Sequence, residues 1–121
     1  IDFLRGKENA KKVLKSYIDH IVTTEINAFE VWLGIYIKEK ANEQEIRNVR
    51  IFFNSIEVLS SSEGDGELAA KILSQLIKKR ETINQNDCLI AAIMISNGYK
   101  KIITNNKKHF SKIEGIEVID Y

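Results

Sequence analysis

Three polar side chains in this sequence stand where an α/β protein binds ligands. Glu25 follows the β-branched run IVTT, Asp87 stands at the start of eight consecutive apolar residues, and Asn106 follows the run KIITN. In open parallel sheets, ligands bind beyond the carboxyl ends of the strands. Carboxylate oxygens suit Mg²⁺ or Mn²⁺, and such a cation activates water for phosphodiester hydrolysis. The three side chains are therefore candidates for one metal-dependent hydrolytic site.

Asp87 also has a purely structural explanation. A carboxylate at the start of a helix can accept a backbone N–H bond and act as the N-cap. Asn84 and Asn86 precede it and can cap equally well, which would leave the carboxylate free and favoured in its charged form by the helix dipole. Both interpretations remain open from the sequence.

Glu25 and Asn106 have structural alternatives of the same kind. Glu25 can interact with the N-terminus of its own helix, with Thr23 or Thr24 as the cap. Asn106 can stabilise the turn TNNKK through bonds from its side chain to the backbone. Neither residue identifies a site alone.

The apolar pattern predicts helices and strands in alternation. We expect helices over residues 6–20, 24–40, 42–55, 67–80 and 84–98, strands over 21–24, 56–60, 100–106 and 116–120, a loop over 60–66, and a helical turn or loop over 107–113. Strands separated by helices imply a parallel sheet that is covered on both faces. The predicted fold is α/β, a three-layer α/β/α sandwich with a central parallel sheet, in a single domain over residues 1–121.

The chain opens on IDFLRG, without a methionine, in what reads as the tail of an apolar element. The four predicted strands do not include the central N-terminal strand that doubly wound sheets usually carry. We expect residues upstream of Ile1 that supply this strand. Asp2 receives no role in the site.

Composition narrows the class of protein. The longest apolar run is eight residues, far below the roughly 20 that a membrane helix needs, and no signal peptide opens the chain, so we expect a soluble cytoplasmic protein. The single cysteine, Cys88, has apolar neighbours and is predicted to be buried and inert. Neither His20 nor His109 has a second histidine or cysteine at zinc spacing, which argues against a structural zinc site.

Two further features leave alternatives open. A group of lysines near the C-terminus, which includes Lys107 and Lys108, has no acid within it and either solvates the surface or binds phosphates. The expected helix over 24–40 carries apolar residues on more than one face. We favour core packing for them over an interface with a second copy or a partner; they are Phe29, Trp32, Leu33, Tyr36 and Ile37.

Three segments resemble the successive blocks of a known family. VTTEINAFEVWLG, NQNDCLIAAIMISNG and IITNNKKHFSKIEGIEV are similar, in this order, to blocks of PIN domains, in particular the VapC toxins of toxin-antitoxin modules. The resemblance covers essentially the whole chain. It implies a parallel sheet between helices, metal-dependent endoribonuclease activity, a VapB-type antitoxin as partner and a homodimer.

The resemblance also implies roles for single residues. The family's acids fall on Glu25 and Asp87, as ligands of Mg²⁺ or Mn²⁺, and its third polar position falls on Asn106. Thr104 stands where the family has a threonine that orients the site. Many members carry a carboxylate in place of Asn106, and the family's first acid lies in a strand ahead of IDFLRG that this sequence does not contain.

Two hypotheses from different classes follow. The first is a metal-dependent endoribonuclease toxin, with Glu25, Asp87 and Asn106 in the catalytic site and Lys107 and Lys108 binding RNA. The second is a non-catalytic PIN-like module that binds RNA or protein. A phosphoacceptor receiver domain fits less well, because the ending EVIDY has no lysine after the last strand.

Overall fold

The computed structural model describes residues 3–17 and 20–121. The chain falls into two compact units, residues 1–59 (the N-terminal unit) and 60–121 (the C-terminal unit), and each is described by itself. Asp2 and the part of the first expected helix at residues 18–19 lie outside the described residues. That residues 1–121 form one domain stays a prediction.

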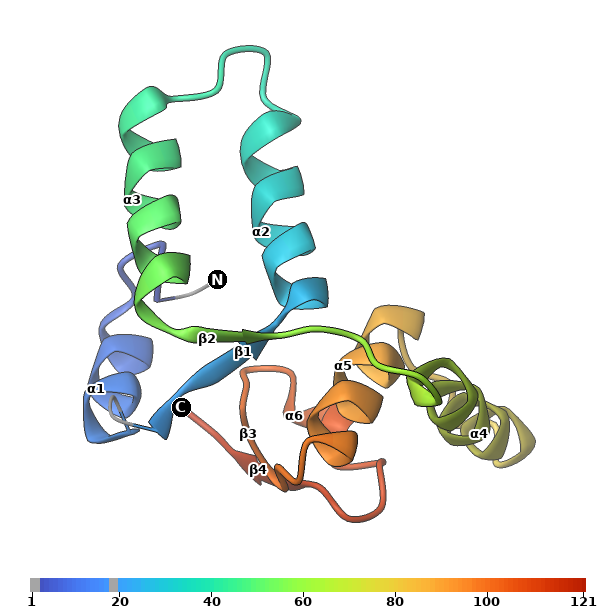
Figure 1. Ribbon diagram of the computed structural model, residues 1–121. Coiled ribbons are helices and arrows are strands. Elements are labelled where there is room, and N and C mark those ends of the chain that lie inside the picture. Colours follow the sequence, from blue (N-terminus) through green and yellow to red (C-terminus); the bar gives the residue numbers. More distant parts are fainter. Residues whose placement is uncertain (1–2, 18–19) are drawn as a thin grey trace. The chain divides into compact units, whose positions relative to one another are not determined.

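The N-terminal unit is built around one parallel strand pair. Its elements are α1 (Glu8–Tyr17), β1 (Val22–Thr24), α2 (Glu25–Tyr36), α3 (Glu43–Ser55) and β2 (Glu57–Leu59). Strands β1 and β2 pair in parallel, with Thr23 opposite Val58. The chain runs from β1 to β2 through α2 and α3, which stand beside each other as a hairpin (Figure 1). This crossover confirms the expected parallel pairing.

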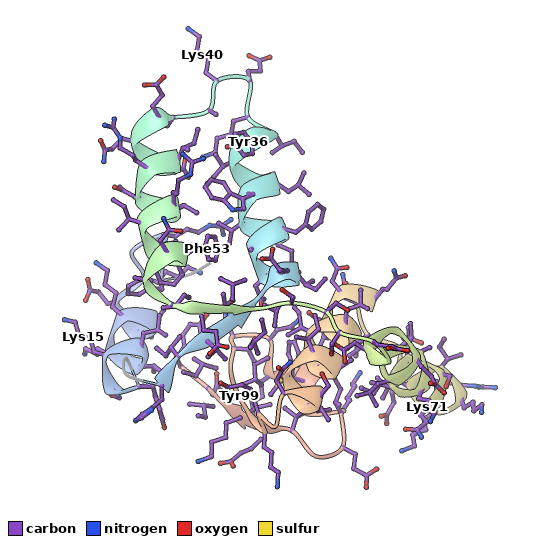
Figure 2. All side chains as sticks on the ribbon, in the orientation of Figure 1. Lys15, Tyr36, Lys40, Phe53, Lys71 and Tyr99 are labelled. Carbon is purple, nitrogen blue, oxygen red and sulfur yellow. The ribbon has the colours of Figure 1, made fainter. Side chains whose placement is uncertain are left out.

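Aromatic side chains pack the hairpin of α2 and α3 together. Trp32 stacks on Tyr36 with ring centroids 5.7 Å apart, and its ring also lies 6.1 Å from that of Phe53 on α3. Arg50 places its guanidinium 5.7 Å from the centre of the Trp32 ring, a cation–π contact. In Figure 2, Phe53 lies between the two helices, and Lys40 in the connecting loop points away from both.

Most of the apolar side chains that α2 carries are not in a core. Phe29, Leu33, Tyr36 and Ile37 are 57%, 49%, 56% and 76% exposed. The interpretation as core packing is therefore wrong for these four and holds only for the half-buried Trp32. The residues follow one another at spacings of four, three and one, which places them on one stripe along α2 and its C-cap Ile37.

Helix α2 is also shorter than predicted. It ends at Tyr36, whereas we expected it to run to residue 40. The chain turns back after Ile37 so that α3 can lie alongside, and an ion pair of 2.8 Å between Lys38 Nζ and Glu45 Oε2 closes this turn. Tertiary pairing of the two helices overrides the helical propensity of the segment IKEK.

The C-terminal unit holds a helix whose middle is buried. Its elements are α4 (Asp65–Lys78), α5 (Gln85–Ser96), β3 (Lys101–Ile103), α6 (Lys107–Phe110) and β4 (Glu117–Ile119). Strands β3 and β4 pair in parallel, with Ile102 opposite Val118. Helix α4 packs along α5 (Figure 1). The buried residues of α5 lie on all its faces: Cys88, Ile90, Ala91, Ala92, Ile93 and Met94.

Cys88 is 1% exposed, as the sequence predicts. Burial raises the pKa of its thiol, and the charge of the adjacent Asp87 raises it further. The thiol is therefore protonated at neutral pH, which fits a small buried side chain rather than a nucleophile.

The start of α4 corrects the expected loop over 60–66. The helix begins at Asp65, within the run SSSEGDG, after Gly64 takes a φ of 90° that favours glycine. Asp65 Oδ2 accepts bonds from the Ser62 backbone N–H at 2.8 Å and from the Ser62 hydroxyl at 3.1 Å. These bonds fold the end of the loop onto the helix, so the glycines do not exclude helix here.

Asp65 is itself a buried acid, 1% exposed. The Ser62 backbone N–H lowers the pKa of its carboxyl, burial opposes this effect, and the hydroxyls of Ser96 and Ser62 lower the pKa further. Within the described part of the chain its other oxygen, Oδ1, is buried without a hydrogen-bond partner. The sequence analysis did not single out this residue.

Among the described residues, no helix is both long and apolar enough to cross a membrane.

Candidate functional site

Asp87 is held on α5 but does not cap it. The N-cap is Asn84, whose side-chain oxygen accepts the Asn86 backbone N–H at 2.8 Å. Asp87 is the third residue of the helix, in its first turn. Capping as the explanation of Asp87 is therefore wrong, and the alternative in which Asn84 caps the helix and the Asp87 carboxylate is not used as a cap is correct. The buried body of α5 makes this first turn a rigid support.

The Asp87 carboxylate is bonded through one of its two oxygens. Its Oδ2 lies 2.8 Å from His109 Nδ1 and accepts a bond of 3.2 Å from Asn106 Nδ2. The side chain is 14% exposed, so the carboxylate sits at the rim of the helix core. Within residues 3–17 and 20–121, Oδ1 makes no hydrogen bond of its own. One oxygen is thus occupied and the other is available.

Thr104 determines where Asn106 stands. The Thr104 N–H donates to the Ile119 carbonyl of β4 at 3.2 Å, which extends the β3–β4 pairing by one residue. The Thr104 hydroxyl oxygen then accepts the Asn106 backbone N–H at 2.9 Å. Asn106 occupies the N-cap position of α6, yet its side chain does not cap that helix and reaches Asp87 instead. The turn alternative for Asn106, in which its side chain bonds to the backbone, is therefore wrong, because the side chain contacts Asp87 and His109.

Glu25 belongs to the N-terminal unit. It is the first residue of α2 and is exposed, directly after the buried Thr24 at the end of β1. The cap of α2 is Thr24, whose side chain accepts the Asn27 backbone N–H at 3.2 Å. No ion pair or hydrogen bond of the Glu25 carboxylate occurs within the described residues. The cap role falls on Thr24, and the Glu25 carboxylate is left accessible.

The structure thus brings Asp87 and Asn106 together within the C-terminal unit. Thr104 joins them because it bonds to the Asn106 backbone. The structure also adds His109, which the sequence analysis set aside because it has no zinc-ligand partner. The signal that could have found it is the spacing N-x-x-H, because residues three apart on a helix share a face. Lys107 and Lys108 are exposed on the same short helix.

The donor chemistry fits a hard cation. Asp87 offers an accessible carboxylate oxygen and Glu25 an exposed carboxylate, and carboxylate oxygens are the ligands that Mg²⁺ and Mn²⁺ prefer. Across the described ranges, no group of three histidine, cysteine or acidic side chains forms a ready ligand set. A cation bound by one such carboxylate would keep several of its waters, as Mg²⁺ usually does.

The chain is similar in sequence to known proteins. The sequence model of the family described as PIN domain matches residues 1–116. A curated relative, Ribonuclease VapC1 of Rickettsia felis, is 46% identical over 50 residues, which are 41% of this chain and 37% of the relative. The matched stretch thus spans just over a third of that relative's length.

Solved structures are similar over nearly the whole chain. DNA-bound VapBC from Salmonella typhimurium has a TM-score of 0.83 at 24% identity, covering 97% of this chain and 88% of that chain. VapBC2 from Rickettsia felis, bound to a promoter DNA fragment, has a TM-score of 0.83 at 23% identity with the same two coverages. VapBC-1 from Haemophilus influenzae has a TM-score of 0.81 at 23% identity, covering 98% and 91%. These likenesses confirm the predicted α/β fold.

Proposed function

The chain belongs to the PIN domain family, and from this premise we propose that it is a Mg²⁺- or Mn²⁺-dependent endoribonuclease, the VapC-type toxin of a toxin-antitoxin pair. The observation that carries the proposal is the Asp87 carboxylate, with one oxygen bonded and the other accessible at the start of a buried helix. The name of the Rickettsia felis relative, Ribonuclease VapC1, supports the same activity.

The proposed roles follow from the chemistry of each side chain. Glu25 and Asp87 hold the cation through carboxylate oxygens. When bound, the cation lowers the pKa of a water and neutralises charge on the departing oxygen of the phosphodiester. Asn106 donates to Asp87 and helps to fix its carboxylate, while Thr104 fixes the Asn106 backbone.

The RNA contact is assigned to α6. Lys107 and Lys108 are exposed there and follow Asn106 directly in the chain, so their ammonium groups can bind phosphates next to the Asp87 cluster. Such contacts weaken as salt rises, because binding releases counterions from the RNA. They supply affinity for the backbone and do not select a base sequence.

The partners are proposed from the exposed stripe of α2. Phe29, Leu33, Tyr36 and Ile37 form an apolar surface, and such surfaces on a single chain mark interfaces. We assign it to contact with a VapB-type antitoxin protein or with a second copy of the chain in a homodimer, and we place the protein in the cytoplasm. Sedimentation of the purified protein tests the homodimer, because a clean monomer at micromolar concentration would remove it.

A titration of metal into an RNA cleavage reaction tests the proposed activity. The full-length protein is stripped of metal with EDTA, and cleavage of a mixed pool of structured RNAs is followed as Mg²⁺ or Mn²⁺ is added. We expect no cutting without metal and cutting that saturates with it. A folded, metal-saturated protein that leaves all the RNAs intact would contradict the endoribonuclease.

The second candidate, a non-catalytic PIN-like module, is favoured by one observation. Asn106 stands where many PIN domains carry a carboxylate, and here it donates a hydrogen bond to Asp87 rather than adding charge. The same titration separates the candidates, because a binding module would retard RNA in a gel without cutting it.

A further inference from the structure

We propose that His109 is a positioning residue for Asp87: together with Asn106 it engages Oδ2 of the carboxylate, so that Oδ1 alone is presented to the cation. The proposal rests on the metal-dependent function above and assigns the residue that prepares its acid. The observation behind it is the 2.8 Å approach of His109 Nδ1 to Asp87 Oδ2, between residues 22 positions apart in the chain.

The Asp87 carboxylate, the only charged acceptor of this cluster, decides where its protons point. Asn106 Nδ2 lies 3.2 Å from Asp87 Oδ2 and 2.8 Å from His109 Nδ1. If Nδ1 carried no proton, its lone pair would face the carboxylate oxygen at 2.8 Å, which is repulsive. Nδ1 therefore carries the proton and donates a hydrogen bond to Oδ2. Asn106 and His109 are then two donors that converge on a single carboxylate oxygen, and the 2.8 Å contact between Nδ2 and Nδ1 is a close approach of these two donors rather than a hydrogen bond.

This convergence fixes the orientation of the carboxylate. A carboxylate with two free oxygens rotates about its terminal torsion, which is broad and roughly two-fold. Two donors on Oδ2 remove that freedom and leave Oδ1, which makes no hydrogen bond within the described residues, as the single open ligand atom. Groups that hydrogen-bond a metal-ligating carboxylate in this way orient it and tune its affinity.

The two donors are themselves held. His109 belongs to α6, three residues after its N-cap Asn106, and the His109 side chain is 35% exposed. Phe110, 4% exposed, anchors the helix. An acid at position 106 would repel Asp87 rather than donate to it. Asparagine at this position thus lets both neighbours of Asp87 act as donors.

An isosteric pair of variants tests the role of His109. His109→Asn keeps a nitrogen donor near the position of Nδ1. In His109→Leu the leucine side chain has almost the same shape as that asparagine but has no donor. Binding of Mn²⁺ to the full-length protein is measured from the electron paramagnetic resonance signal of the free ion. We expect His109→Leu to weaken binding by about tenfold or more, and His109→Asn to stay within about threefold of the wild type. Equal affinity for the wild type and His109→Leu would overturn the proposal.

A second measurement needs neither metal nor RNA. The nitrogen chemical shifts of the His109 imidazole in the metal-free protein report which ring nitrogen is protonated. We expect a protonated Nδ1 in the wild type and a loss of this preference in Asp87→Asn, with unchanged melting temperature. A proton on Nε2 alone in the wild type would overturn the proposal. If the wild type binds no Mn²⁺, the proposed function fails, and the nitrogen shifts still decide whether His109 holds Asp87.

Discussion

Helices α2 and α5 share the same sequence features but have different surroundings in the structure. Both are rich in apolar residues, both are capped by the polar residue that precedes them, and both carry an acid in the first turn, Glu25 and Asp87. Helix α5 buries its apolar residues on all faces, whereas α2 buries only Ala28 and Ile35 and exposes a stripe. Apolar content alone therefore does not tell whether a helix forms a core or presents a surface.

The two acids differ in exposure, as the apolar residues of their helices do. Asp87 is 14% exposed and bonded by two donors, while Glu25 is exposed and makes no hydrogen bond or ion pair within the described residues. A bonded acid has a fixed orientation before a cation arrives, and a free acid does not. The comparison predicts that both acids serve function and that neither serves the stability of the fold.

Among the variants that set α2 against α5, Glu25→Gln has the largest expected effect, and the effect is on cleavage. We expect the rate of RNA cleavage to fall by about a thousandfold, about 4 kcal/mol of transition-state stabilisation. The melting temperature should stay unchanged, because the exposed carboxylate makes no hydrogen bond or ion pair with residues 3–17 or 20–121. Glu43→Gln is the matched control, since Glu43 is also the exposed first residue of a capped helix. Equal rates for the two variants would remove Glu25 from the site.

The next prediction compares how much an apolar side chain of each helix contributes to the free energy of unfolding. Ile93→Ala in α5 removes a side chain that is 1% exposed, and we expect it to lower the free energy of unfolding by about 3 kcal/mol. Leu33→Ala in α2, where the side chain is 49% exposed, should lower it by less than about 0.5 kcal/mol. Urea unfolding of both variants gives the two values. Similar losses would mean that the α2 stripe is packed in solution.

A smaller effect concerns the buried acid Asp65 and depends on pH. Because folding lowers the pKa of this carboxyl below its ordinary value of 3.8, the charged form stabilises the fold above that pH, and the contribution is lost as pH falls below it. We expect Asp65→Asn to reduce the free energy of unfolding by about 2 kcal/mol at pH 7, and the difference from the wild type to shrink below about pH 4. Urea unfolding across this range measures it, with Glu63→Gln in the same loop as control. A difference that stays constant with pH would contradict the role of the charge.

The fold was predictable because the signals for it are local. The β-branched runs at Val22–Thr24 and Lys101–Ile103 and the periodicity of the helices are read from neighbouring residues, and the alternation of helix and strand implies parallel pairing. The end of α2 and the start of α4 were missed. Each depends on a partner that sequence patterns do not reveal, the packing of α3 for one and the Ser62 bonds of Asp65 for the other.

The candidate site was predictable only in part. The positions of Asp87 and Asn106 relative to a helix start and a strand end followed from the sequence, as did Thr104 through the family resemblance. His109 was set aside because it was judged as a zinc ligand, whereas its contact is with a carboxylate 22 residues away in the chain. A contact over this separation is tertiary, and a single sequence carries no direct sign of it.

The central claim is that Asp87 serves catalysis rather than the fold, and one substitution tests it directly. Cleavage of RNA in saturating Mg²⁺ or Mn²⁺ is measured for the wild type, Asp87→Asn and Asn84→Ala, together with the melting temperature of each. We predict that Asp87→Asn abolishes cleavage with its melting temperature nearly unchanged. Asn84→Ala should cut RNA but melt several degrees lower, because it removes the cap of α5. Metal-dependent cleavage at the wild-type rate by Asp87→Asn would contradict the account.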